Sequence, residues 1–94
     1  MEEYLQQYNE VLLRAFPNGI ARDDLEYLLT LIHINFSKRN AARLAAETFG
    51  EDYYDMLNFV NGLDGGSTIG IDRNRLETIR QVLREAGWKW QLLD

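Results

Sequence analysis

Hydrophobic residues recur every three or four positions through most of this chain, which is the spacing of a helix that buries one face. The clearest example is residues 2–16, with apolar side chains at positions 4, 5, 8, 11, 12, 15 and 16. Pro17 and Gly19 end this pattern, because Pro disfavours the α conformation in the preceding residue and Gly accepts a left-handed one. We therefore expect the first helix to occupy residues 2–16.

Two further helices are predicted between residues 23 and 50. Asp23 and Glu26 have the spacing of a capping box, so they should open a second helix. This helix is apolar on nearly all sides, which indicates a central position in the fold. Ser37 is a favourable N-cap for a third helix, and Gly50 is its C-terminal stop. Alanines at positions 41, 42, 45 and 46 favour the close approach of a neighbouring helix.

The last two predicted helices flank a glycine-rich loop. Asp52 is a favourable N-cap for a fourth helix, which is followed by residues 61–71 with four of the seven glycines. Either Asp72 or Asn74 caps a fifth helix, and Gly87 ends it. The loop before the last helix is the only long connection that the pattern predicts.

The overall pattern indicates one helical domain. A minor β-strand is expected either in residues 68–71 or in the C-terminal tail, where apolar and polar residues alternate from position 88 to position 92. The chain has 94 residues, of which 46% are hydrophobic and 27% charged, and these values are typical of a single globular domain. The sequence therefore predicts an all-α fold, a compact bundle of about five short helices that forms a single domain over residues 1–94.

Charge and composition indicate the expected cellular location of the protein and its relation to membranes and nucleic acid. The net charge is −5, there is no cysteine, and the first residues are acidic, unlike the basic start of a signal peptide. The longest apolar stretch, residues 28–36, is interrupted by polar residues and is far shorter than the ~20 residues of a membrane span. We expect a cytoplasmic protein that does not enter a membrane and whose average charge disfavours nucleic acid.

Residues that usually carry catalysis or bind cofactors are sparse. Gly62, Gly65 and Gly66 lie in the loop, but the segment lacks the ending of a phosphate-binding loop and the ligand spacing of an EF-hand. His33 is the only histidine, and we interpret it as a structural residue of an apolar helix. We therefore expect no cofactor, no metal site and no enzymatic activity. An enzyme centred on His33 or Asp64 is the alternative.

Acidic residues concentrate in one part of the chain. Residues 51–72 contain five Asp or Glu and no Lys or Arg. Some of these acids favour the positive N-terminus of a helix, and the others can face a basic partner protein. Aromatic residues add interface anchors, since one tyrosine of the pair at 53–54 and one of the two tryptophans are expected to be exposed. The predicted partner-binding residues are Glu51, Asp52, Tyr54, Asp55, Asp64 and Trp90.

Basic residues form two other groups. If the helices around residues 38–49 and 73–86 lie side by side, they present one basic patch to nucleic acid. Glu77 and Glu85 alternate with the arginines at helical spacing, and this favours a face of paired charges instead. The residues of the hypothetical nucleic-acid patch are Lys38, Arg39, Arg43, Arg73, Arg80 and Arg84.

These observations favour a small non-enzymatic protein that binds another macromolecule. The first hypothesis is a protein–protein interaction or regulatory module. Its sharper version is an immunity- or inhibitor-like protein whose acids neutralise a basic partner. Nucleic-acid binding through the two basic helices is the alternative.

Three segments of the chain match the motifs of a known family in order and approximate spacing. Residues 13–20 read Leu-Arg-Ala-Phe-Pro-Asn-Gly-Ile, residues 24–31 end in Leu-Leu-Thr-Leu, and residues 79–88 end in Ala-Gly-Trp. Together they resemble a small actinobacterial family known as domain of unknown function 3349. The resemblance implies a bacterial all-α domain of about five helices, and it implies no activity, cofactor or site residue.

Overall fold

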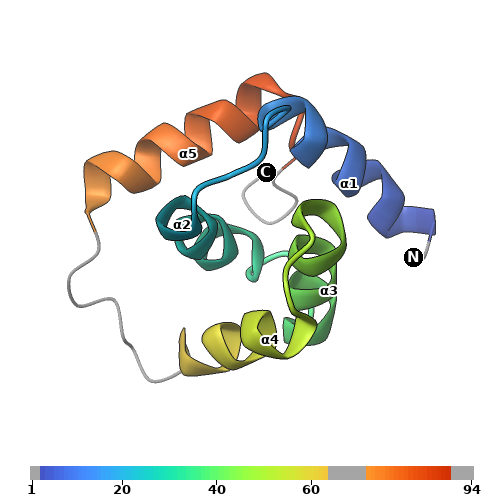
Figure 1. Ribbon diagram of the computed structural model, residues 1–94. Helices are drawn as coiled ribbons and strands as arrows, with labels where there is room; N and C mark the ends of the chain where they lie inside the picture. Colours follow the sequence, from blue (N-terminus) through green and yellow to red (C-terminus); the bar gives the residue numbers. More distant parts are fainter. Residues whose placement is uncertain (1–2, 64–71, 90–94) are drawn as a thin grey trace.

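Five helices make up the fold in the computed structural model, which describes residues 3–63 and 72–89 (Figure 1). They are α1 (Glu3–Ala15), α2 (Arg22–Ile32), α3 (Lys38–Phe49), α4 (Tyr53–Gly62) and α5 (Arg73–Glu85). The described ranges contain no strand, and the expected all-α bundle of about five short helices is confirmed. Residues 68–71 and the tail after position 89, where a minor strand is expected, lie outside the described residues.

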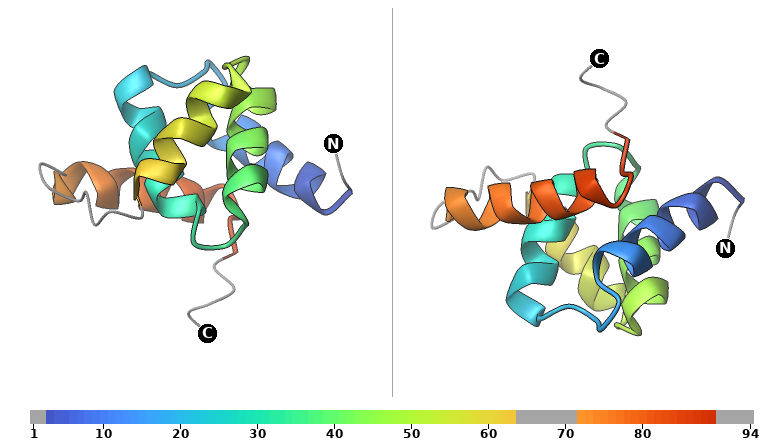
Figure 2. Two further views of the ribbon diagram at one scale, coloured as in Figure 1. Left: turned by 90° about the horizontal axis from the view of Figure 1, so that it is seen from below. Right: turned by 90° about the horizontal axis from the view of Figure 1, so that it is seen from above.

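Helices α4 and α5 lie on opposite sides of the molecule, with α2 between them (Figures 1 and 2). The most extensive helix–helix contact joins α3 to α4, which are connected by a short turn. Helix α5 packs on α2 and on α1, and α1 also packs on α3. None of the described helices is both long and apolar enough to cross a membrane.

The core lies along α2, which has five buried residues and packs on α3, α4 and α5. Leu28, Leu29 and Ile32 are completely buried in it, as the all-round apolar pattern of this helix predicts. The four alanines of α3 are also buried, and their small side chains explain why α4 and α1 approach α3 closely. Asn9 donates a hydrogen bond of 2.7 Å to the Thr48 hydroxyl and adds a polar contact between α1 and α3.

Most helix starts follow from short-range chemistry. The Ser37 hydroxyl accepts a hydrogen bond from the Asn40 amide at 3.1 Å, as expected for the N-cap of α3. Asp72, and not Asn74, caps α5, because its carboxylate accepts from the amides of Asn74 and Arg75 at 2.9 and 3.2 Å. The predicted capping box at Asp23 is wrong. Helix α2 begins two residues earlier than that box requires, and its N-cap is Ala21, which makes no side-chain hydrogen bond.

The last helix ends in a turn that returns the chain to the core. Gly87 adopts a left-handed conformation with φ of 103°, and its amide donates to the Arg84 carbonyl at 3.1 Å. The Trp88 amide donates to the Leu83 carbonyl at 2.9 Å, which completes a Schellman motif. This turn buries the Trp88 side chain, which is only 4% exposed, against the rings of Tyr8 and Phe36.

Candidate functional site

The start of α4 carries two of the predicted partner-binding acids, Asp52 and Asp55. Asp52 is the N-cap, and its carboxylate accepts hydrogen bonds from the amides of Tyr54 and Asp55 at 2.8 and 3.1 Å. Asp55 follows in the first turn with an exposed side chain. Both carboxylates lie at the positive end of the helix dipole, so part of their role is to stabilise α4.

Tyr54 is the most exposed of the large hydrophobic side chains in the described part of the chain, at 70%. Its neighbour Tyr53 is partly buried against the core, and the two rings meet edge to face with centroids 5.2 Å apart. One ring therefore packs inward and the other points outward, as the sequence pattern predicts. An exposed tyrosine held by a second aromatic ring is a suitable anchor for a protein interface.

Glu51 is paired within the chain. Its carboxylate oxygen lies 3.1 Å from Nη1 of Arg22, at the start of α2. The Arg22 side chain remains 54% exposed and the Glu51 side chain 31% exposed, so the pair is near the surface. Sequence reasoning did not find Arg22, because 29 positions separate it from Glu51 and no local pattern links them.

The outer face of α4 is polar and has no basic residue. Met56 and Val60 face the core, where α4 packs on α3 and, less extensively, on α2. Asn58 and Asn61 are exposed at helical spacing from Tyr54. Residues 51–63 contain three acids and no Lys or Arg. We call Glu51, Asp52, Tyr54, Asp55 and the two exposed asparagines the α4 face. Asp64 and Trp90, the other predicted partner-binding residues, lie outside the described residues.

The two basic helices, α3 and α5, are not main neighbours of each other. Helix α5 packs mainly on α2 and α1, whereas the main neighbour of α3 is α4. The condition for a single basic patch, that the two basic helices lie side by side, is therefore not met among the main helix contacts. The physical reason is that α2, with its broad apolar surface, takes the central position against which the amphipathic α5 packs.

Two of the basic side chains on α5 also contact polar side chains of their own helix. Arg80 pairs with Glu77 at 3.2 Å, and the Arg84 guanidinium donates to the Gln81 side chain at 3.3 Å. Arg39, Arg43 and Arg73 are exposed, and Lys38 is partly buried. The sequence favours a helix face on which Glu and Arg side chains pair, and one such pair is present on α5, between Glu77 and Arg80.

His33 follows the last turn of α2 and is partly buried. Its Nδ1 atom lies 2.8 Å from the Thr30 carbonyl oxygen and 3.2 Å from that of Leu29, so a proton on Nδ1 is donated to the end of its own helix. This is the position of a C-terminal capping residue. Within residues 3–63 and 72–89, no group of three or more carboxylate or imidazole side chains is arranged to hold a metal ion.

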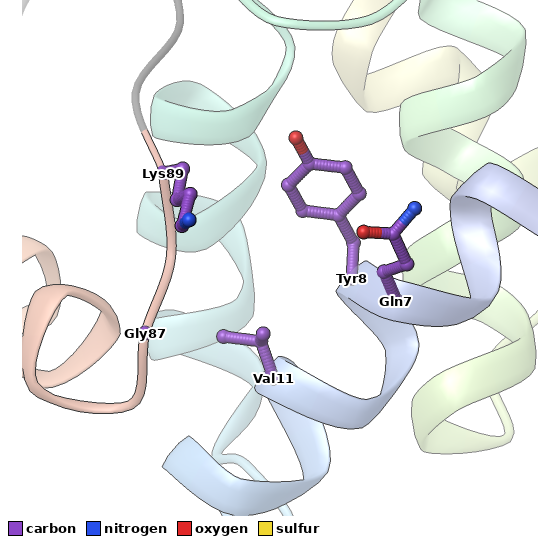
Figure 3. A pocket seen from close by; sticks show the side chains of 5 residues that line it. All are labelled: Gln7, Tyr8, Val11, Gly87 and Lys89. Atoms are coloured by element: carbon purple, nitrogen blue, oxygen red, sulfur yellow. The ribbon is translucent and has the colours of Figure 1, made fainter.

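A small pocket of about 120 Å³ lies between α1 and the chain that follows α5 (Figure 3). Val11 and the Tyr8 ring line one side, with Gln7 next to them, and Gly87 and Lys89 line the other. Pockets for cofactors or drug-sized ligands usually have volumes of about 300–1,000 Å³, so this one is much smaller than the usual ligand site.

Comparisons with known proteins identify no relative of this chain. No family model matches the chain, and neither a curated protein nor a solved structure matches it.

Proposed function

We propose that this protein is a non-enzymatic binding module and that its α4 face docks a basic partner protein. The observation that carries the proposal is the exposed Tyr54 ring, located among acids at the N-terminus of α4. Interfaces are commonly centred on aromatic anchors with charged residues around them. A polar face next to such an anchor can supply the hydrogen bonds that fix the partner's orientation.

Charge supports a basic rather than an acidic partner. The whole chain has a net charge of −5, and no Lys or Arg between residues 51 and 63 offsets the acids there. An acidic surface of this kind accelerates encounter with a positively charged protein and repels acidic ones. Neutralisation of a partner's functional basic surface, as an immunity or inhibitor protein would do, is the sharper form of this proposal.

A cytoplasmic location and membership of the family known as domain of unknown function 3349 belong to the same proposal. The residues that support the family resemblance are at positions 13–20, 24–31 and 79–88, in α1 and its following turn, in α2, and at the end of α5. None of these segments is on the α4 face, so the binding proposal does not depend on the family assignment.

The test is a capture experiment with matched variants. Tagged wild-type protein, the double variant Tyr54→Ala/Asp55→Asn and the control Glu10→Gln are incubated with lysate of the source cells, with and without nuclease. Glu10 is an exposed acid on α1, so its substitution changes the net charge without touching α4. We expect a basic protein that the wild type and the control retain after nuclease and that the double variant loses.

Two outcomes would contradict the proposal. Equal capture by the double variant and the wild type would mean that the partner binds elsewhere on the molecule. Loss of all partners after nuclease treatment would favour nucleic-acid binding, in which case the arginines of α3 and α5 become the first residues to test.

A further inference from the structure

The ion pair between Arg22 and Glu51 indicates what kind of group the α4 face accepts. Glu51 immediately precedes the N-cap of α4 and is three residues from the exposed Tyr54. Its carboxylate already receives a guanidinium, at 3.1 Å, from a residue of another helix. The structure thus contains an arginine seated at the edge of the acidic surface that the proposed partner would contact.

We propose that the basic partner presents an arginine to the α4 face and that this arginine displaces Arg22 from Glu51. The proposal rests on the function proposed above and adds the chemistry of recognition and its internal competitor. Arg22 then occupies Glu51 in the free protein and competes with the partner's arginine, which lowers the affinity for the partner. When Arg22 leaves, Glu51 becomes available to the partner, three residues before Tyr54 and four before Asp55 in the sequence.

Displacement of Arg22 requires little energy. Both side chains are substantially exposed, and pairs of this kind in water change an equilibrium by about two- to five-fold at most. Arg22 also opens α2 without providing its cap, since Ala21 is the N-cap residue. Its side chain can therefore leave Glu51 without loss of a helix-capping hydrogen bond.

Arginine fits the α4 face better than lysine does. A planar guanidinium can stack on a tyrosine ring and bind a carboxylate with two parallel hydrogen bonds, whereas an ammonium group is a compact, strongly hydrated charge. Tyr54 offers an exposed ring, and Asp55 and Glu51 offer carboxylates on either side of it in sequence. A partner that used lysine would gain the Coulomb attraction without the stacking.

The experiment measures the binding of fluorescein-labelled hexa-arginine and hexa-lysine peptides to the full chain by fluorescence anisotropy at low salt. The variants are Arg22→Gln and its control Arg43→Gln, which removes the same charge from an exposed position on α3. Each is combined with Glu51→Gln in a second pair of variants. The double variant Tyr54→Ala/Asp55→Asn, with Glu10→Gln as control, tests the α4 face itself.

We expect hexa-arginine to bind more tightly than hexa-lysine, which carries the same charge. Arg22→Gln should raise the affinity for hexa-arginine about two- to five-fold beyond the effect of Arg43→Gln, and this excess should vanish when Glu51 is Gln. Equal effects of Arg22→Gln and Arg43→Gln would overturn the competition by Arg22, and equal binding of the two peptides would overturn the preference for arginine. Either result leaves the α4 face in place. If Tyr54→Ala/Asp55→Asn binds hexa-arginine as tightly as Glu10→Gln does, the proposed α4 face itself fails.

Discussion

The backbone amide of Asp72 donates a hydrogen bond of 3.0 Å to the hydroxyl of Tyr27, which lies 45 residues earlier in the chain. A second contact between the start of α5 and α2 is the ion pair between Arg75 and Asp24. Together these contacts fix the start of α5 on α2, at the point where the described chain resumes after the glycine-rich segment. A side chain of one helix thus satisfies a donor near the N-terminus of another.

Replacing Tyr27 with Phe should therefore lower stability by removing one hydrogen-bond acceptor while leaving the ring in place. We expect the free energy of unfolding to fall by about 0.5–1.5 kcal/mol, the usual net value of such a bond. Urea unfolding followed by circular dichroism measures the change. Tyr54→Phe is the control, since the exposed Tyr54 hydroxyl makes no hydrogen bond to any of the residues that the structure describes. Equal stability of the two variants would show that the Tyr27 contact contributes nothing.

Two glycines should respond to alanine in opposite directions. Gly87 has a φ of 103°, which an alanine adopts only with strain, and no atom lies within 4 Å of the position that its Cβ would take. Gly87→Ala should thus destabilise by about 1 kcal/mol or more through backbone conformation alone. Gly62 ends α4 with equal space around it, so Gly62→Ala should be neutral or stabilising by up to about 1 kcal/mol. Thermal unfolding of both variants tests the contrast, and a loss of stability in both would contradict it.

The burial of Trp88 can be read from its fluorescence. Its ring lies 4.6 Å from that of Tyr8 and 6.0 Å from that of Phe36, measured between centroids, and the residue is 4% exposed. In the variant Trp90→Phe, which leaves Trp88 as the only tryptophan, the emission should be blue-shifted and insensitive to iodide. Emission at the wavelength of free tryptophan, or strong quenching, would show that the turn after α5 does not hold the ring in the core.

The features that the sequence predicts correctly depend on residues close together in the chain. Ser37 and Asp52 cap helices by bonding to amides two or three residues later, and Gly50 ends α3 in a left-handed conformation, with φ of 71°. Asp23 shows the limit of this reasoning: a carboxylate in the first turn is favourable to the helix dipole whether or not it is the cap.

The features that the sequence did not predict join distant segments. No local pattern connects Arg22 with Glu51 or Tyr27 with Asp72, because each pair meets only after the helices pack. The sequence also left open whether α3 and α5 are adjacent, because charge spacing describes one helix at a time and does not decide which helices are neighbours. The candidate site was found in part because Tyr54 and Asp55 are consecutive and share the first turn of α4.

Substitutions of Asp52 can separate two roles of the acids at the start of α4, which are to cap the helix and to supply negative charge for binding. Its carboxylate caps α4 through two amides, so Asp52→Ala should lower the free energy of unfolding by about 1 kcal/mol. Asp52→Asn keeps an oxygen that accepts from the same amides, so stability should change much less, while the negative charge is lost. If the α4 face binds a basic partner, Asp52→Asn should still weaken binding of hexa-arginine, by up to about five-fold.

Stability and peptide affinity are therefore measured on the same two variants. A destabilised Asp52→Ala together with a stable, weakly binding Asp52→Asn would mean that one carboxylate both caps the helix and contributes charge to the surface. Full affinity in Asp52→Asn would restrict this residue to capping and would place the binding charge on Asp55 and Glu51, which make no capping bond to α4. Equal losses of stability in both variants would contradict the capping geometry, because the Asn oxygen should replace that of Asp.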